Sequence, residues 1–331
     1  MHIMKPTQIL TALVALTFIA LTSPVLATHL PDQLLETPIH LTSGETVTLA
    51  QYKGKKPVYL KFWATWCQPC RKEMPHLAHI HAQYGDSIEV IAINLGINDQ
   101  LNDVIATQHE FGLTLPMAMD TSGDLAQVFH LRGTPYHLLF DQQMNLVHVG
   151  NAANEQLDTK IALLARKKPI NLVESHTIPD SAPDLSFDLE NGSTHALFFT
   201  ATWCDWYLKD SRPKVSKNCT TAQQNINKLY EERPDINWQG IISRLWTADK
   251  DLIDYKKKYR IAHPLTVDES NGLFHRFNIK KLPTLIVVKD GKVILKVQEF
   301  GTINDLKQKL QRGVLSKITR QIVHRSTLMQ P

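Results

Sequence analysis

The sequence predicts an α/β protein of two tandem domains, each with a mixed central sheet and helices on both faces. A six-residue motif occurs twice, as FWATWC at 62–67 and as FTATWC at 199–204. A block that runs from an aspartate to a proline ahead of an apolar strand also occurs twice, at 120–135 and 268–283. Strand-like and helix-like segments alternate between these landmarks, which is the pattern of a sheet containing parallel strands. With 331 residues, 43% of them hydrophobic, the chain can bury two such cores.

The elements of the first copy follow from its hydrophobic pattern. The apolar run 58–63 has the length and the aromatic content of a buried strand. Beyond it we expect a helix at 67–84, a strand at 88–94, a helix at about 98–111, two strands after Pro135 and a closing helix at 154–166. In the second copy, Asp290-Gly291 supplies the positive backbone angles of a tight turn. We therefore expect a terminal hairpin there.

The first 27 residues have the pattern of an export signal. Lys5 precedes an apolar stretch at 9–21, and the small residues Val25 and Ala27 are placed for cleavage. A retained membrane anchor is the alternative, which the short apolar stretch and Pro24 disfavour. We expect a periplasmic or secreted protein. The predicted organisation is a signal peptide at 1–27, a first domain at 28–166, a linker at 167–182, a diverged second domain at 183–313 and a tail at 314–331.

Charge and cysteine content narrow the function classes. The net charge is +4, but 36 basic residues are scattered among 32 acidic ones, which disfavours nucleic-acid binding. Export into an oxidising compartment would allow the four cysteines to form disulfides. His76, His79 and His81 cluster after the first cysteine pair, but no carboxylate or thiol completes a ligand set. We expect neither a metal nor a cofactor.

Cys67-Gln68-Pro69-Cys70 is the most informative segment. It lies where a strand runs into a helix, so unpaired N–H groups and the positive end of the helix dipole would favour a thiolate at Cys67. We expect Cys67 on the exposed first turn and Cys70 facing inward. The alternatives are a structural disulfide or half of a zinc site, but the other two cysteines lie in the second copy.

Several motifs together resemble one family. They are 47–54 (VTLAQYKG), 62–70 (FWATWCQPC), Glu73, Pro75 and Thr134-Pro135 before a strand. The first copy as a whole resembles the thioredoxin-like superfamily, specifically the TlpA-like periplasmic thiol–disulfide oxidoreductases. The second copy resembles it more weakly.

The resemblance implies roles for the matching residues. Cys67 would attack a substrate disulfide and Cys70 would resolve the mixed disulfide. Pro135 would be the family's cis-proline, and Thr134 would offer its backbone to an extended substrate. The remaining residues expected to contact substrate or tune the cysteine pair are Trp66, Gln68 and Pro69.

Three further positions are Glu73, Lys61 and Pro75. Glu73 and Lys61 each have two interpretations, and Pro75 has a structural one. Glu73 matches a carboxylate that relays protons, or it is a solvated helix residue. Lys61 stands where many relatives place a buried Asp or Asn. Its amine would either point at the cysteines and stabilise a thiolate, or extend to solvent. Pro75 matches a proline that kinks the helix.

The second copy departs from the pattern. Cys204 keeps the attacking position, but Tyr207 replaces the resolving cysteine and the next cysteine is Cys219. Cys204 and Cys219 could form a structural disulfide or a slower redox pair, or Cys204 could be a lone thiol. Asp205 would tend to raise the pKa of a thiol at Cys204, which favours the inert interpretations.

We therefore expect an exported reductase or isomerase that acts on disulfides of exported proteins through Cys67 and Cys70. The resemblance implies an upstream donor, a membrane thiol transporter, and substrates such as apocytochromes or copper-site proteins. The second domain would shape substrate access or form a dimer. The alternative is a peptide-binding assembly factor or chaperone whose cysteine pair switches conformation, and an oxidant role is a weaker option.

Overall fold

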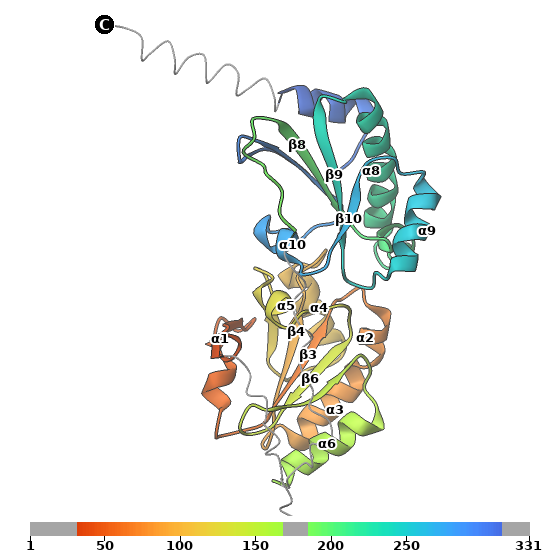
Figure 1. Cartoon of the computed structure of the whole chain (residues 1–331). Helices are drawn as coiled ribbons and strands as arrows, with labels where there is room; N and C mark the ends of the chain where they lie inside the picture. The colour runs from red at the N-terminus through yellow and green to blue at the C-terminus, as the bar shows by residue number, and fades with distance from the viewer. Residues whose placement is uncertain (1–31, 168–184, 313–331) are drawn as a thin grey trace, which may run out of the picture.

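The computed structural model describes residues 32–167 and 185–312, which form two domains (Figure 1). The first domain consists of α1 Asp32–Leu35, β1 Ile39–His40, β2 Thr46–Val47, a 3-10 helix at Leu49–Tyr52, β3 Val58–Trp63, α2 Gln68–Lys72, α3 Met74–Tyr84, β4 Glu89–Asn94, α4 Leu101–Glu110, β5 Met117–Met119, α5 Asp124–Val128, β6 Tyr136–Phe140, β7 Leu146–Gly150 and α6 Glu155–Ala165. The second consists of β8 Thr194–Thr200, α7 Cys204–Tyr207, α8 Pro213–Glu232, β9 Ile236–Ser243, α9 Asp249–Tyr259, β10 Leu265–Asp268, α10 Gly272–Arg276, β11 Thr284–Lys289, β12 Lys292–Val297 and a helical segment at 303–312.

The two five-stranded sheets have the same topology, and β1 and β2 form a separate two-stranded sheet. The first has the strand order β5-β4-β3-β6-β7 and the second has the order β10-β9-β8-β11-β12. In each, three neighbouring strands are parallel and the last two are antiparallel. The predicted pair of α/β domains with mixed sheets is confirmed, as is the hairpin at Asp290-Gly291.

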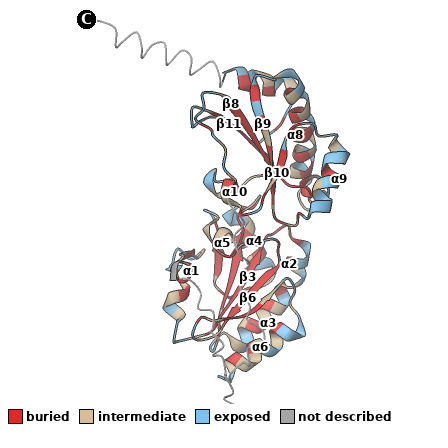
Figure 2. Cartoon of the chain, in the orientation of Figure 1, coloured by how far each residue is buried: buried red, intermediate tan, exposed pale blue. Residues whose placement is uncertain are grey.

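The central strand β3 carries the site. All six of its residues are buried, because β4 and β6 pair with it on either side and helices cover the sheet. Figure 2 shows this buried layer running through the middle of each domain. Helices α3 and α6 lie side by side, joined by a 2.7 Å contact between His76 Nε2 and Asp158 Oδ1.

Two predicted helices differ from the observed ones. The expected helix at 67–84 is two helices, α2 and α3, that meet at Glu73, because Pro75 cannot donate a backbone hydrogen bond in the first turn of α3. The helix expected from 98 begins instead at Leu101, since Asn98 has a φ of 54° and belongs to a loop.

The two domains contact each other at the carboxyl ends of β3 and β4 (Figure 1). One apolar cluster contains buried residues of both domains, including Trp66 and Cys67 from the first and Trp203 and Cys204 from the second. Helix α10 meets α5, where His275 Nε2 lies 2.6 Å from Asp124 Oδ1. The domains therefore bury the ends of the sheets from which both cysteine motifs start.

Some predictions concern residues outside the described ranges. These are the signal peptide at 1–27, nearly all of the linker at 167–182 and the tail at 314–331. Among the helices at 32–167 and 185–312, none combines the length and the apolar character needed to cross a membrane.

Candidate active site

The first cysteine pair lies where β3 leads into α2. Cys67 is the N-cap of α2, and Pro69 in the first turn has a backbone angle suited to a helix start. Cys67 and Cys70 form a disulfide, with sulfurs 2.03 Å apart and Cα atoms 5.2 Å apart. The backbone N–H of Cys70 donates to Sγ of Cys67 at 3.2 Å. This contact places a hydrogen-bond donor of the first helical turn on the sulfur of Cys67.

The expectation that Cys67 is exposed is wrong, because Cys67 and Cys70 are both fully buried. The second domain supplies the cover. The ring of Trp66 stacks on that of Trp203 with centroids 5.0 Å apart. The backbone N–H of Gln68 donates to the hydroxyl of Tyr207 at 3.1 Å. The sequence around Cys67 describes its local helix, but not the distant residues that cover it.

The Thr134–Pro135 peptide bond is cis, as predicted, and so is Leu282–Pro283 in the second domain. Thr134 is buried, and its carbonyl oxygen accepts a hydrogen bond from Nε1 of Trp246 at 3.0 Å. The backbone that we expected to receive a substrate is therefore occupied by a side chain of the same protein.

A charged network joins β3, β6 and the junction between α2 and α3. Nζ of Lys61 lies 2.6 Å from Oε2 of Glu73, and Lys61 is fully buried. Nε2 of His137 lies 3.2 Å from the same oxygen, and the Tyr59 hydroxyl lies 2.7 Å from Nδ1 of His137. The backbone N–H of Ala153 donates to the other Glu73 oxygen at 2.9 Å. The Lys61 side chain is fully buried, that of Glu73 is only 17% exposed, and the two are paired with each other, so neither extends into solvent as the second interpretation of each required.

These contacts shift the pKa values in different directions. Burial alone would raise the pKa of the Glu73 carboxyl, but hydrogen bonds from His137, Lys61 and Ala153 and the lysine charge lower it to about 2. Burial lowers the pKa of Lys61, against the opposing effect of Glu73. Burial also lowers the pKa of His137. Glu73 is therefore ionised at neutral pH, and His137 is neutral.

A second polar network holds the residues just before Cys67. Asp99 is buried and accepts from the backbone N–H of Thr65 at 2.8 Å and from its hydroxyl at 2.5 Å. Nδ2 of Asn94 donates to Asp99 at 2.8 Å. The guanidinium of Arg212, from the second domain, reaches Thr65 at 2.7 Å and Asp99 at 3.2 Å. Residues of both domains thus position the turn that precedes Cys67.

The sequence of the chain is similar to those of known proteins. The AhpC/TSA family matches residues 27–149. The thioredoxin-like protein YneN of Bacillus subtilis is 34% identical over 136 residues, which is 40% of this chain and 76% of YneN. This chain belongs to the thioredoxin-like family. Its first domain is of the TlpA-like thiol–disulfide oxidoreductase type.

Other similar proteins carry related names. The thiol–disulfide oxidoreductase ResA of Bacillus thuringiensis is 30% identical over 118 residues, which is 35% of this chain and 66% of that ResA. The match covers 59% of the Bacillus subtilis ResA. Among solved structures, a secreted Mycobacterium tuberculosis disulfide oxidoreductase has a TM-score of 0.37 at 20% identity, covering 40% of this chain and all of that one. StoA from Bacillus subtilis has a TM-score of 0.34 at 23% identity, covering 38% and 94%.

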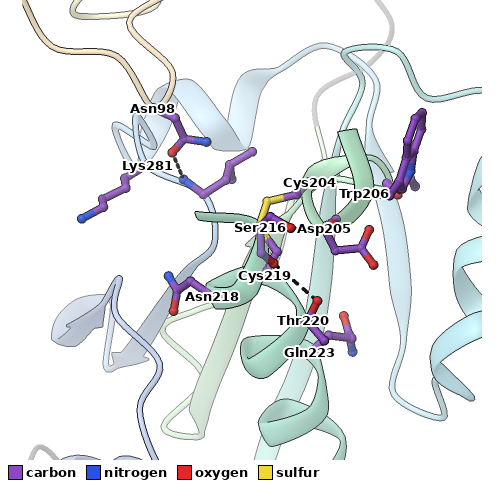
Figure 3. Close-up of a disulfide and its surroundings, with 12 residues drawn as sticks. Asn98, Cys204, Asp205, Trp206, Ser216, Asn218, Cys219, Thr220, Gln223 and Lys281 are labelled. Atoms are coloured by element: carbon purple, nitrogen blue, oxygen red, sulfur yellow. Dashed lines mark hydrogen bonds between the residues drawn. A yellow bond between two sulfur atoms is a disulfide. The ribbon is translucent and has the colours of Figure 1, made fainter. Parts of the chain in front are cut away.

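The second thioredoxin-like domain also holds a disulfide. Cys204 in the first turn of α7 is joined to Cys219 in α8, and both are buried (Figure 3). A lone Cys204 thiol is therefore ruled out, while the structural and redox interpretations both remain. Asp205 bonds to Lys258 and Tyr259. Its charge is thus balanced within the second domain.

Sequence reasoning missed His137 and Tyr59 in this thioredoxin-like site. His137 is directly opposite Lys61 in the antiparallel pairing of β3 with β6. A histidine two residues after the cis-proline, inside an apolar strand, is the signal that could have revealed it. Asp99 lies in a loop and offers no comparable signal. Within residues 32–167 and 185–312, no group of three or more His, Cys, Asp or Glu could hold a metal ion.

Proposed function

We propose that this protein is an exported thiol–disulfide oxidoreductase that reduces or isomerises disulfides in exported protein substrates through Cys67 and Cys70. The main support is the position of Cys67 as the N-cap of α2, with its disulfide partner in the same turn. The names of the ResA relatives support the same chemistry.

In the reducing direction, the Cys67 thiolate attacks one sulfur of a substrate disulfide. A mixed disulfide forms, and the other substrate sulfur leaves as a thiolate that takes up a proton. The Cys70 sulfur, after losing its proton, attacks Sγ of Cys67 and releases the second substrate sulfur. Two electrons have then passed from the Cys67–Cys70 dithiol to the substrate. A thiol donor, which we assign to a membrane protein, restores the dithiol.

The surrounding residues receive roles within this proposal. Lys61 and Glu73 balance the charge and proton of the Cys70 sulfur, because they form a buried pair and Glu73 directly follows α2. The substrate contacts are assigned to the residues that flank the cysteines and the cis-proline, namely Trp66, Gln68, Pro69, Thr134 and Pro135.

The proposal includes a place of action and an organisation. The export pattern of residues 1–27 supports a periplasmic or secreted protein. The domain division is the one given by the repeats, 28–166 and 183–313. The second domain controls access to the first, which is supported by its position over Cys67.

The test is turnover of a disulfide-linked peptide with dithiothreitol as the donor. We expect Cys67→Ser to abolish catalysis and Cys70→Ser to accumulate a mixed disulfide with the peptide. The proposal fails if Cys67→Ser turns the peptide over as fast as the unaltered chain.

Burial of the cysteine pair favours one alternative, an assembly factor that uses the pair as a redox switch. In that case the reduced and oxidised chains would differ in peptide binding, and Cys67→Ser would not change the slow background rate of disulfide reduction.

A further inference from the structure

The two domains contact each other through equivalent residues. Asn98 follows β4 and Trp246 follows β9, and both have left-handed backbone angles, with φ of 54° and 48°. Asn98 donates its backbone N–H to the Lys280 carbonyl at 2.8 Å, and Trp246 donates to the Arg132 carbonyl at 2.9 Å. Each acceptor lies three residues before a cis-proline. The same loop of each domain thus docks beside the cis-proline of the other.

Both side chains also reach the residue just before the cis-proline. The backbone N–H of Leu282 donates to Oδ1 of Asn98 at 2.9 Å, and Nε1 of Trp246 donates to the Thr134 carbonyl at 3.0 Å. Trp246 therefore makes two hydrogen bonds to the loop that the family resemblance assigns to an extended substrate. Trp246 therefore occupies the acceptor groups of that loop.

The place of Trp246 is shaped for an aromatic ring. A Cβ atom at Gly133 would lie only 3.0 Å from Nε1 of Trp246, so the ring rests on a position that has no side chain. The Trp66 ring meets Trp246 edge-on with centroids 5.4 Å apart. We call this place, bounded by Gly133, Thr134 and Trp66, the aromatic slot.

The second domain lacks such a slot, although its contacts are otherwise equivalent. At the position that corresponds to Gly133, two residues before its cis-proline, it carries Lys281. It receives the small polar Asn98 rather than an aromatic ring, near the Cys204–Cys219 disulfide (Figure 3). The slot is thus a property of the domain with the Cys67–Cys70 pair, and not of every cis-proline loop in the chain.

We propose that the aromatic slot is a substrate subsite for a tryptophan near the cysteine of an incoming polypeptide, and that Trp246 fills it when the domains are closed. The inference rests on the proposed function, since it names the class of segment that reaches Cys67. An indole ring suits the slot because it combines a large apolar surface with one N–H donor, and the Thr134 carbonyl accepts that donor. Phenylalanine would fill the slot without this hydrogen bond, and alanine would leave it empty.

The test uses disulfide-linked peptides that differ only in one residue beside the cysteine, Trp, Phe or Ala, with dithiothreitol as donor. It compares the full chain with Trp246→Ala and with Trp206→Ala, which removes a tryptophan that is 60% exposed. We expect Trp246→Ala to raise turnover of the Trp peptide and to give it a KM about tenfold below that of the Ala peptide, with Phe between them. Trp206→Ala should behave as the unaltered chain does.

Gly133→Lys is the second variant, because it installs the residue of the other domain and fills the slot from within. It should expel the Trp246 ring and speed alkylation of reduced Cys67, yet show no preference for the Trp peptide. Equal KM values for all three peptides with an active Trp246→Ala chain would overturn the slot while leaving the proposed function intact. If no peptide is turned over faster than by Cys67→Ser, the proposed function itself fails.

Discussion

Replacing Glu73 by Gln tests the buried network directly. The carboxyl pKa falls from 4.5 to about 2 in the folded protein. At roughly 1.36 kcal/mol per pKa unit, ionised Glu73 stabilises the fold by about 3 kcal/mol. Its side chain is 17% exposed, so solvent screens part of this, and a glutamine oxygen can still accept the hydrogen bond from Ala153. We therefore expect Glu73→Gln to lower the free energy of unfolding by about 2 kcal/mol at neutral pH.

The pH dependence follows from the direction of the pKa shift. Because the folded pKa lies below the unfolded value, the stabilisation is complete above pH 4.5 and is lost as the pH falls through about 2. We would measure urea unfolding of the unaltered chain and of Glu73→Gln at pH 7, 4 and 2.5. The difference in their free energies of unfolding should be largest at pH 7 and smallest at pH 2.5. Glu110→Gln is the matched control, since its pair with Arg71 is exposed and should contribute less than about 1 kcal/mol. The reasoning is refuted if Glu73→Gln costs no more than Glu110→Gln, or if its cost is unchanged at pH 2.5.

Two further predictions concern the second domain. Replacing Cys204 and Cys219 together by Ser opens a loop with a sequence separation of 15, and should lower the free energy of unfolding under oxidising conditions by about 3 kcal/mol. A loss below about 1 kcal/mol would contradict a structural role. So would a difference in unfolding free energy between the unaltered chain and the double variant that stays the same after the disulfide of the unaltered chain has been reduced. Arg212→Ala removes hydrogen bonds to Thr65 and Asp99 and should speed iodoacetamide alkylation of reduced Cys67 about tenfold, because the domains separate more often. Arg233→Ala removes an ion pair internal to the second domain, so equal rates for both variants would show that Arg212 does not hold the domains together.

Local sequence was sufficient for the parts of the site that are local in the fold. The Cys67–Cys70 pair could be placed because a buried strand and a helix start each have their own residue pattern, and Pro135 could be placed because the family resemblance implies a cis-proline there. The surroundings of Lys61 could not, because its partner Glu73 follows a helix break and His137 arrives through the register of an antiparallel strand. Pro75 indicated a kink in this helix, but a single sequence gives neither the direction of the Glu73 side chain nor the register of β3 with β6.

Burial of Cys67 was outside the reach of motif reasoning for another reason. The cover depends on how the two domains pack. In the sequence Tyr207 showed only that a resolving cysteine is missing, and Trp246 belonged to no motif, so neither indicated a contact with the first domain. The repeat revealed that there are two units. It did not reveal that their equivalent faces meet.

The pairing of equivalent faces has a consequence for any partner of this protein. Since both faces belong to one polypeptide, the second domain is a competitor whose effective concentration does not fall when the protein is diluted. Under the proposed function, a polypeptide substrate binds only those molecules in which the faces have separated, so its apparent affinity is the intrinsic affinity reduced by that fraction. If the chain were cut between the two domains, the second domain would become a separate molecule, and dilution would lower its concentration and so weaken its competition.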